Sequence, residues 1–231
     1  MLNRVKYRLK FTKSGNVRFI GHLDLMSLFN MAIKRAKLPI AYSEGFNPHQ
    51  VLSFALPLSL GYHSNGEYLD MQLTKPMDCK ELVDSLNANM PDGIRIVAAG
   101  RIADTDKNAA AIISSCAYRV ILPEAHRIKH DDAKNFIAQE QIIISKKTKK
   151  NLADVDIAPD IFEFVPKANV LVEEILLRIS AGPERSVRAD SVMKALFAFA
   201  GEEYPEHGLT YVREEMYSDV QGKKPLLGTE A

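Results

Sequence analysis

Residues 4–11 alternate between cationic and apolar side chains. The apolar positions are Val5, Tyr7, Leu9 and Phe11, and the cationic positions are Arg4, Lys6, Arg8 and Lys10. A period of two predicts a half-buried strand, here with one face entirely cationic. Residues 14–16 then predict a turn, and residues 17–20 predict that the strand continues or returns.

Helical spacing replaces this alternation after residue 22. Apolar residues recur at intervals of three and four until Pro39, which predicts a helix over residues 22–38. Asp78, with Glu81 three positions later, predicts a second helix that starts with a capping box. The other elements predicted in this half are strands at 51–55, 67–73 and 94–98, with a turn at 64–66 before the second of them.

The resulting order, β-α-β-β-α-β, is that of a ferredoxin-like fold. After an alanine-rich joint at 103–111, a similar order returns, with an insertion at 147–168. We therefore predict an α+β protein of two tandem ferredoxin-like halves, residues 1–103 and 112–217, each an antiparallel sheet with helices on one face. A flexible tail is predicted at 218–231. One irregular α+β layer is the alternative for the second half.

Composition restricts the class of protein. Of the 231 residues, 46% are apolar and 26% are charged, which excludes a mainly disordered or fibrous chain. The longest mostly apolar stretch, residues 51–61, is too short to cross a bilayer, and residues 1–11 lack the apolar block of a signal peptide. The two cysteines, Cys79 and Cys116, are therefore expected to be reduced thiols in a cytoplasmic protein.

Positive charge is concentrated near the start of the chain. Although the net charge is only +1, residues 1–50 hold nine cations against Asp24 and Glu44, a local charge of +7. The nine cations are Arg4, Lys6, Arg8, Lys10, Lys13, Arg18, Lys34, Arg35 and Lys37. Such a region fits a surface that meets phosphate or an acidic protein. Ordinary solvated faces of a strand and a helix explain it equally well.

Several kinds of site are excluded by motif. No phosphate-binding glycine loop or dinucleotide fingerprint occurs. Two cysteines cannot supply the thiolates of a zinc ribbon or an iron–sulfur cluster. No metal site is predicted, and the six histidines show no helical pairing with a carboxylate.

The segment 42–49 stands out as a candidate binding loop. It combines aromatic, amide, hydroxyl and imidazole groups with a flexible glycine and a proline turn. Its candidate ligand-binding residues are Tyr42, Ser43, Glu44, Phe46, Asn47 and His49. The alternative is an ordered loop whose Phe46 fills the edge of the core.

A second cluster falls at the start of the first predicted helix. Arg18, Gly21, His22 and Asp24 lie where free backbone N–H groups and the helix dipole attract anions. His22, Asp24 and His49 are the catalytic candidates, although His22 also fits a capping role beside Asp24. The two clusters are expected at opposite ends of one helix, so they need not form one site.

Four stretches together resemble a known family. They are residues 15–26, residues 42–49, residues 54–61 and residues 67–70, with His22, Asp24, Gly45, Asn47, Pro48 and His49 in the family pattern. The chain is similar here to the radical-SAM-associated (radical-SAM-linked) family of unknown function; Gln50 and Val51 depart from the usual pattern. The resemblance implies a radical-SAM enzyme as partner. It places the iron–sulfur cluster and S-adenosylmethionine on that partner, since this chain has no three-cysteine motif.

Three functions are compatible with these features. The first is an accessory or substrate-binding protein that works with a radical-SAM enzyme in RNA (tRNA) modification or metabolism. In this hypothesis a base stacks on Phe46 or Tyr42, and Arg4, Arg8 and Arg18 hold phosphates. The second is a metal-independent RNA-processing enzyme that uses His22 or His49 for proton transfer. The third is a scaffold that binds only a protein partner.

Overall fold

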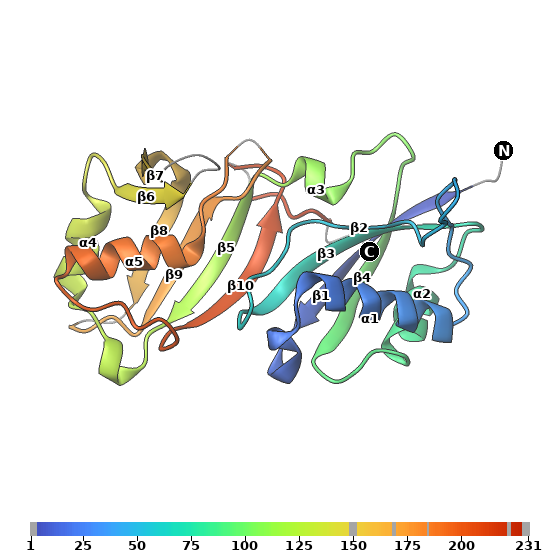
Figure 1. Ribbon diagram of the computed structural model, residues 1–231, viewed down its shortest axis with the longest axis horizontal. Coiled ribbons are helices and arrows are strands. Elements are labelled where there is room, and N and C mark those ends of the chain that lie inside the picture. The colour runs from blue at the N-terminus through green and yellow to red at the C-terminus, as the bar shows by residue number, and fades with distance from the viewer. Residues whose placement is uncertain (1–3, 148–151, 168–169, 184, 221–222, 228–231) are drawn as a thin grey trace. The chain divides into compact units, whose positions relative to one another are not determined.

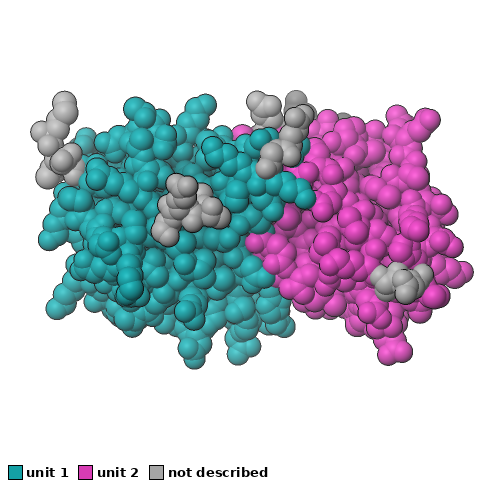
Figure 2. All heavy atoms as spheres, turned by 180° about the vertical axis from the view of Figure 1, so that it is seen from behind, with its two compact units in different colours: residues 1–113, 215–231 teal, residues 114–214 magenta. Residues whose placement is uncertain are grey.

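The computed structural model describes residues 4–147, 152–167, 170–183, 185–220 and 223–227. The chain forms two compact units, residues 1–113 with 215–231 (unit 1) and residues 114–214 (unit 2), coloured separately in Figure 2. Both contain helices and antiparallel strands, so the protein is α+β, with mostly antiparallel sheet. None of the described helices is long and apolar enough to span a membrane.

Unit 1 contains the segments that carry most of the candidate residues (Figure 1). Its elements are β1 (Val5–Lys13), η1 (Gly15–Phe19), α1 (His22–Arg35), β2 (Leu52–Phe54), β3 (His63–Leu73), α2 (Cys79–Asn87), β4 (Ile94–Ile102) and α3 (Ala109–Ile112). The strands are arranged β4-β1-β3, β2 pairs with β3, and these pairs are antiparallel.

The alternation along β1 separates the core from a polar face. Tyr7, Leu9 and Phe11 are buried in one apolar cluster with residues of both helices, including Phe29 of α1 and Leu82 of α2. The helices therefore cover this face of the sheet. Arg8 and its partner on β4, Gly100, belong to the other face, because successive side chains of a strand point to opposite sides.

Unit 2 repeats the combination of sheet and helices. Its elements are β5 (Ser115–Ile121), η2 (Glu124–His126), α4 (His130–Ile137), β6 (Ile143–Lys147), β7 (Leu152–Asp156), η3 (Ala158–Asp160), β8 (Ile161–Lys167), β9 (Glu174–Ser180), α5 (Ala189–Phe199) and β10 (Thr210–Tyr217). The strand order is β10-β5-β9-β8, β6 and β7 form a separate two-stranded sheet, and the unit boundary falls within β10. Phe136 of α4 contacts Phe164 of β8, with ring centroids 5.7 Å apart.

Two local predictions are wrong. Residues 17–20 do not continue the strand; residues 15–19 form η1, because Gly15 adopts a φ of +59° and turns the chain out of β1. Residues 64–66 do not form a turn between strands. They lie inside β3, where Ser64 pairs with Lys13 and Glu67 with Phe11, so β1 extends the ladder across the polar stretch.

The predicted insertion contains secondary structure, and part of the predicted tail packs on the protein. The segment 147–168 includes β7, η3 and β8, while Thr148, Lys149, Lys150, Asn151 and Ala168 lie outside the described residues. In residues 218–231, for which a flexible tail was predicted, Pro225 forms an isolated β-bridge with Tyr217, and Leu226 is buried. Arg8 helps to hold this segment in place, because its Nη1 donates to the Leu226 carbonyl at 2.9 Å.

Candidate nucleic-acid interface

The cationic face of β1 is held by internal partners. Arg8 is only 4% exposed, and its Nε and Nη2 donate to the two carboxylate oxygens of Asp70 at 2.7 and 3.0 Å. Lys10 Nζ lies 2.6 Å from Glu215 Oε2, and Lys6 Nζ donates to the carbonyls of Asp104 and Asp106. The four cations share a face as the alternation predicts, but Arg8 is not a surface residue.

Strand register explains the burial of Arg8. The β1–β3 ladder places Arg8 opposite Asp70, and the Asp70 carboxylate also accepts from the backbone N–H of Ala109 at 2.7 Å. Arg8 Nη2 donates to the carbonyl of Lys107 at 3.1 Å. Buried charges are tolerated when they are paired and hydrogen-bonded in this way. The pair therefore ties the segment after β4 to the sheet.

Glu215 of β10 contacts side chains of both β1 and β3 on the same face of the sheet. Its carboxylate accepts from Tyr68 at 2.7 Å as well as from Lys10. Burial, followed by the neighbouring charge of Glu215, raises the pKa of Tyr68 far above its usual range. Tyr68 therefore remains a neutral donor at all physiological pH values.

The candidate loop 42–49 is closed by Ser43 and His49. Ser43 Oγ lies 2.9 Å from His49 Nδ1, and the backbone N–H of Ser43 donates to the His49 carbonyl at 2.8 Å. Phe46, which lies between them, is fully exposed, and Tyr42, directly before Ser43, is 43% exposed. The loop is thus ordered, but Phe46 does not fill the edge of the core.

Arg4 is the cation nearest this loop. Its Nη2 donates to the Tyr42 carbonyl at 3.2 Å and lies 3.6 Å from Glu44, which is exposed. A surface ion pair of this kind contributes little stability. Arg4 is therefore the one cation of the β1 face that lies beside the exposed aromatic residues of the loop.

At the other end of α1, Arg18 lies over an exposed aromatic ring. Its guanidinium carbon is 4.5 Å from the ring centroid of Phe19, which is 59% exposed, and its Nη1 is 3.0 Å from His63 Nε2. Burial and then the Arg18 charge lower the pKa of His63. A neutral imidazole can accept from Arg18 and hold the guanidinium against the ring. We call Arg18, Phe19 and His63 the Arg18 patch.

The Arg18 patch depends on two chain segments that are distant in sequence. The backbone N–H of Gly61 donates to the Arg18 carbonyl at 3.0 Å, which brings the start of β3 beside η1. Sequence reasoning selected Arg18 but missed Phe19 and His63. The apolar Phe19 fits a core strand pattern, and nothing local indicates the contact of His63 with a residue 45 positions earlier.

His22 and Asp24 begin α1 beside this patch. The His22 ring packs edge-on against Phe54, with centroids 5.4 Å apart, and Gly21 as N-cap supplies no side chain. The helix has 14 residues, which corresponds to about 21 Å. Gln50, the residue after His49, donates to the carbonyl of Asn30, eight residues along α1 from His22. Among the described residues no hydrogen bond joins His49 to His22 or Asp24, so the structure does not bring them into one proton-transfer site.

The described residues hold no group of three or more histidines, cysteines or acidic residues placed to bind a metal ion. Cys79 is partly buried and Cys116 is buried, and neither forms a disulfide. The groups that lie together in the Arg18 patch are a guanidinium, an imidazole and a phenyl ring. These can bind phosphate and stack against a planar ring.

The fold and the candidate residues define an α+β protein with exposed aromatic and cationic groups at both ends of α1. Residues 6–189 match the family described as an uncharacterized protein conserved in bacteria (DUF2344), and the chain belongs to that family. It is similar at 12% identity to a crystal structure of an unknown protein from Galdieria sulphuraria, covering 92% of this chain and 98% of that chain with a TM-score of 0.27. No curated protein matches the chain.

Proposed function

We propose that this chain is an accessory, substrate-binding protein that presents an RNA, such as a tRNA, to a radical-SAM enzyme. The observation that supports the proposal is the Arg18 patch, where a guanidinium lies 4.5 Å from an exposed aromatic ring. Stacking of a base on an aromatic side chain is worth about 1–3 kcal/mol, and an adjacent cation adds attraction for phosphate. RNA recognition favours such sites because unpaired bases can be splayed out and stacked.

The loop 42–49 offers a second contact of the same kind. Phe46 and Tyr42 provide exposed rings, and Arg4 is the nearby cation. A single strand that follows α1 for about 21 Å would reach from one group to the other. In this proposal Arg8 does not contact the RNA strand along α1, because it is buried and paired with Asp70.

The remaining parts of the proposal concern the partner and the architecture. The iron–sulfur cluster and S-adenosylmethionine belong to the radical-SAM partner, and both proteins act in the cytoplasm, where the thiols of Cys79 and Cys116 remain reduced. Two tandem ferredoxin-like units carry the binding groups. This arrangement is supported by the β-α-β-β-α-β order of Val5 to Ile102 and by the strand order β4-β1-β3 with β2 beside β3.

A titration of labelled bulk tRNA, followed by fluorescence anisotropy, tests RNA binding. We expect binding that weakens as salt rises. Phe19→Ala and Arg18→Ala should each weaken it by about fivefold or more, since each removes a stacking or charge contact. Phe46→Ala measures the contribution of the loop separately.

Two exposed residues of unit 2 serve as matched controls. Val170→Ala removes an exposed apolar side chain, and Lys134→Ala removes an exposed cation. Neither should change the affinity by more than the error of the measurement. Absence of binding at low salt, or equal losses in the controls, would refute the proposal.

A protein-binding scaffold is the second candidate, because α1 exposes apolar side chains. Leu23 is 75% exposed and Met31 is 54% exposed. Co-expression with a radical-SAM enzyme from the same organism tests it. A complex that forms without nucleic acid and is lost in Leu23→Asp with Met31→Asp would favour the scaffold; a complex that needs RNA would favour the first proposal. No observation favours the RNA-processing enzyme.

A further inference from the structure

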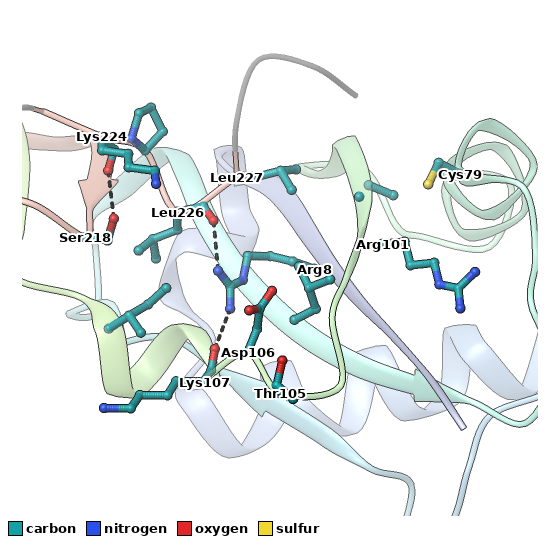
Figure 3. Close-up of a pocket in the computed structure, with 15 residues that line it drawn as sticks. Arg8, Cys79, Arg101, Thr105, Asp106, Lys107, Ser218, Lys224, Leu226 and Leu227 are labelled. Carbon is teal, nitrogen blue, oxygen red and sulfur yellow. Dashed lines mark hydrogen bonds between the residues drawn. The ribbon is translucent and has the colours of Figure 1, made fainter. Parts of the chain in front are cut away.

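A cavity of about 680 Å³ lies in unit 1, apart from the Arg18 patch (Figure 3). Arg8 and Gly100 reach it from the sheet face that α1 and α2 leave uncovered. The loop after β4, residues 105–107, and the C-terminal segment, residues 224–227, also line it. Its volume falls in the range of about 300–1,000 Å³ that is typical of small-molecule sites.

The cavity carries an excess of positive charge. Arg101, Lys107 and Lys224 line it, are exposed, and form no ion pair within the part of the chain that the structure describes. Asp106 is the one acid among the lining residues, and its carboxylate already accepts from the backbone N–H of Ala103 at 3.0 Å. These three cations differ in this respect from Arg8 and Lys10, which are paired.

Arg8 adds a fixed donor to the wall of the cavity. Its contacts with Asp70, Lys107 and Leu226 use four of the five N–H donors of a guanidinium. The fifth, on Nη1, has no partner among the described residues. In the view of Figure 3, Lys107 and Lys224 lie on one side of Arg8, and Arg101 lies on the other side, toward Cys79. Lys107 and Lys224 are therefore exposed cations on the same side of Arg8, and the side chain of Lys107 extends away from it.

An apolar surface adjoins these cations. Leu226, Leu227 and Ile112 line the cavity, and Leu227 lies directly on Gly100. A Cβ atom at position 100 would come within 2.6 Å of Leu227 Cδ1, so a larger residue there would displace the Leu227 side chain. The cavity thus combines a wall suited to a flat, weakly polar group with a cationic end suited to an anion.

We infer that this cavity binds the phosphate group of a nucleoside phosphate. Lys107, Lys224 and the free Nη1–H of Arg8 bind the phosphate oxygens, and the base or ribose lies against the leucine side chains. Charge-assisted hydrogen bonds to phosphate are the strong class of such contacts. The phosphate belongs either to a free nucleotide or to the 5′ end of an RNA. The site does not depend on RNA binding at the Arg18 patch, because no residue of that patch lines it.

Isothermal titration calorimetry of the full chain with four probes tests the inference. The probes are AMP, adenosine, and one short RNA in 5′-phosphorylated and 5′-hydroxyl forms. We expect a phosphorylated probe to bind about tenfold or more tightly than its unphosphorylated form. The double variant Lys107→Ala, Lys224→Ala should lose most of this roughly tenfold preference for the phosphorylated probe. Lys34→Ala with Lys134→Ala, which removes two exposed lysines elsewhere, should not.

The comparison of probes distinguishes the source of the phosphate. Tight binding of AMP supports a free nucleotide as ligand, and tight binding of the phosphorylated RNA alone supports an RNA end. Equal affinities for the phosphorylated and unphosphorylated forms would overturn the inference. So would wild-type affinity in the Lys107→Ala, Lys224→Ala protein, or no binding of any probe. Failure here, with tRNA binding still sensitive to Phe19→Ala, would leave the proposed function intact.

Discussion

At the scale of single residues, the most consequential interaction is the ion pair between Arg8 and Asp70. Both side chains are almost fully buried, and Asp70 also holds the backbone of Ala109. In such a pair the removal of one partner leaves an uncompensated buried charge. Arg8, which looks like an exposed phosphate ligand in the sequence, is therefore held inside the fold by four of its five N–H donors.

Asp70→Asn should destabilise the protein by about 3 kcal/mol, because Arg8 loses its counter-charge. Urea unfolding measures the change. Asp84→Asn is the control: Asp84 pairs with Lys80 on the surface of α2, and its loss should cost less than about 1 kcal/mol. Similar costs for the two substitutions would contradict the account of the buried pair.

His63 provides a pH-dependent prediction. Burial and then Arg18 lower its pKa below 6.5, so the unfolded chain takes up this proton at a higher pH than the folded chain. The contribution of His63 to stability should therefore be complete above pH 6.5 and should fall as the pH drops through the unfolded pKa toward the folded one.

A histidine NMR titration checks this shift. The midpoint of His63 should lie below the ordinary value of 6.5, and Arg18→Ala should raise it part of the way back. Burial is the larger cause of the shift and remains in the variant. A His63 midpoint that Arg18→Ala leaves unchanged would show that Arg18 does not lie beside the imidazole in solution.

At the scale of elements, hydrophobic periodicity predicted most of the helices and strands. The helix predicted over residues 22–38 is α1, and Asp78 caps α2 by accepting from the backbone N–H of Glu81 at 3.0 Å. Local patterns suffice where an element is amphipathic or capped. They failed at η1 and at residues 64–66, where a glycine conformation and a distant strand decide the structure.

The same limit applies to the candidate site. The aromatic and polar groups of the loop 42–49 could be selected from the sequence, because the turn residues fall inside that segment. The partners of Arg8 and Arg18 could not. Asp70 and His63 are 62 and 45 residues away, and only strand register brings them into contact.

Asp78→Ala should lower the stability of the protein by about 1 kcal/mol, since it removes an N-cap acceptor from α2. The midpoint of thermal unfolding reports the loss. Asp92→Ala, an exposed acid in the turn after α2, should leave that midpoint nearly unchanged. An equal shift in both variants would contradict a specific capping role.

At the scale of the whole molecule, the C-terminal segment belongs to the fold of unit 1. Leu226 is buried, its carbonyl accepts from Arg8, and Pro225 bridges Tyr217. Together with the segment after β4, it limits access to the polar face of the sheet. The groups left for ligands are therefore the exposed ones at the two ends of α1 and in the cavity.

Leu226→Ala should destabilise unit 1 by about 2 kcal/mol, because it removes buried apolar surface. Hydrogen exchange should then increase in β1 and in the segment after β4, which the Arg8 contacts join. Leu171→Ala, at an exposed position, is the control and should cost less than about 0.5 kcal/mol. Unchanged exchange in Leu226→Ala would mean that the segment does not pack on the sheet.

The central claim is that RNA stacks on Phe19 beside Arg18. Ultraviolet cross-linking of the purified protein to tRNA, followed by mass spectrometry of the peptides, tests it most directly, because cross-links form where a base touches a side chain. We expect the principal cross-link at Phe19, and its loss in Phe19→Ala. Cross-links confined to other parts of the chain, or their absence under conditions in which tRNA binds, would contradict the claim.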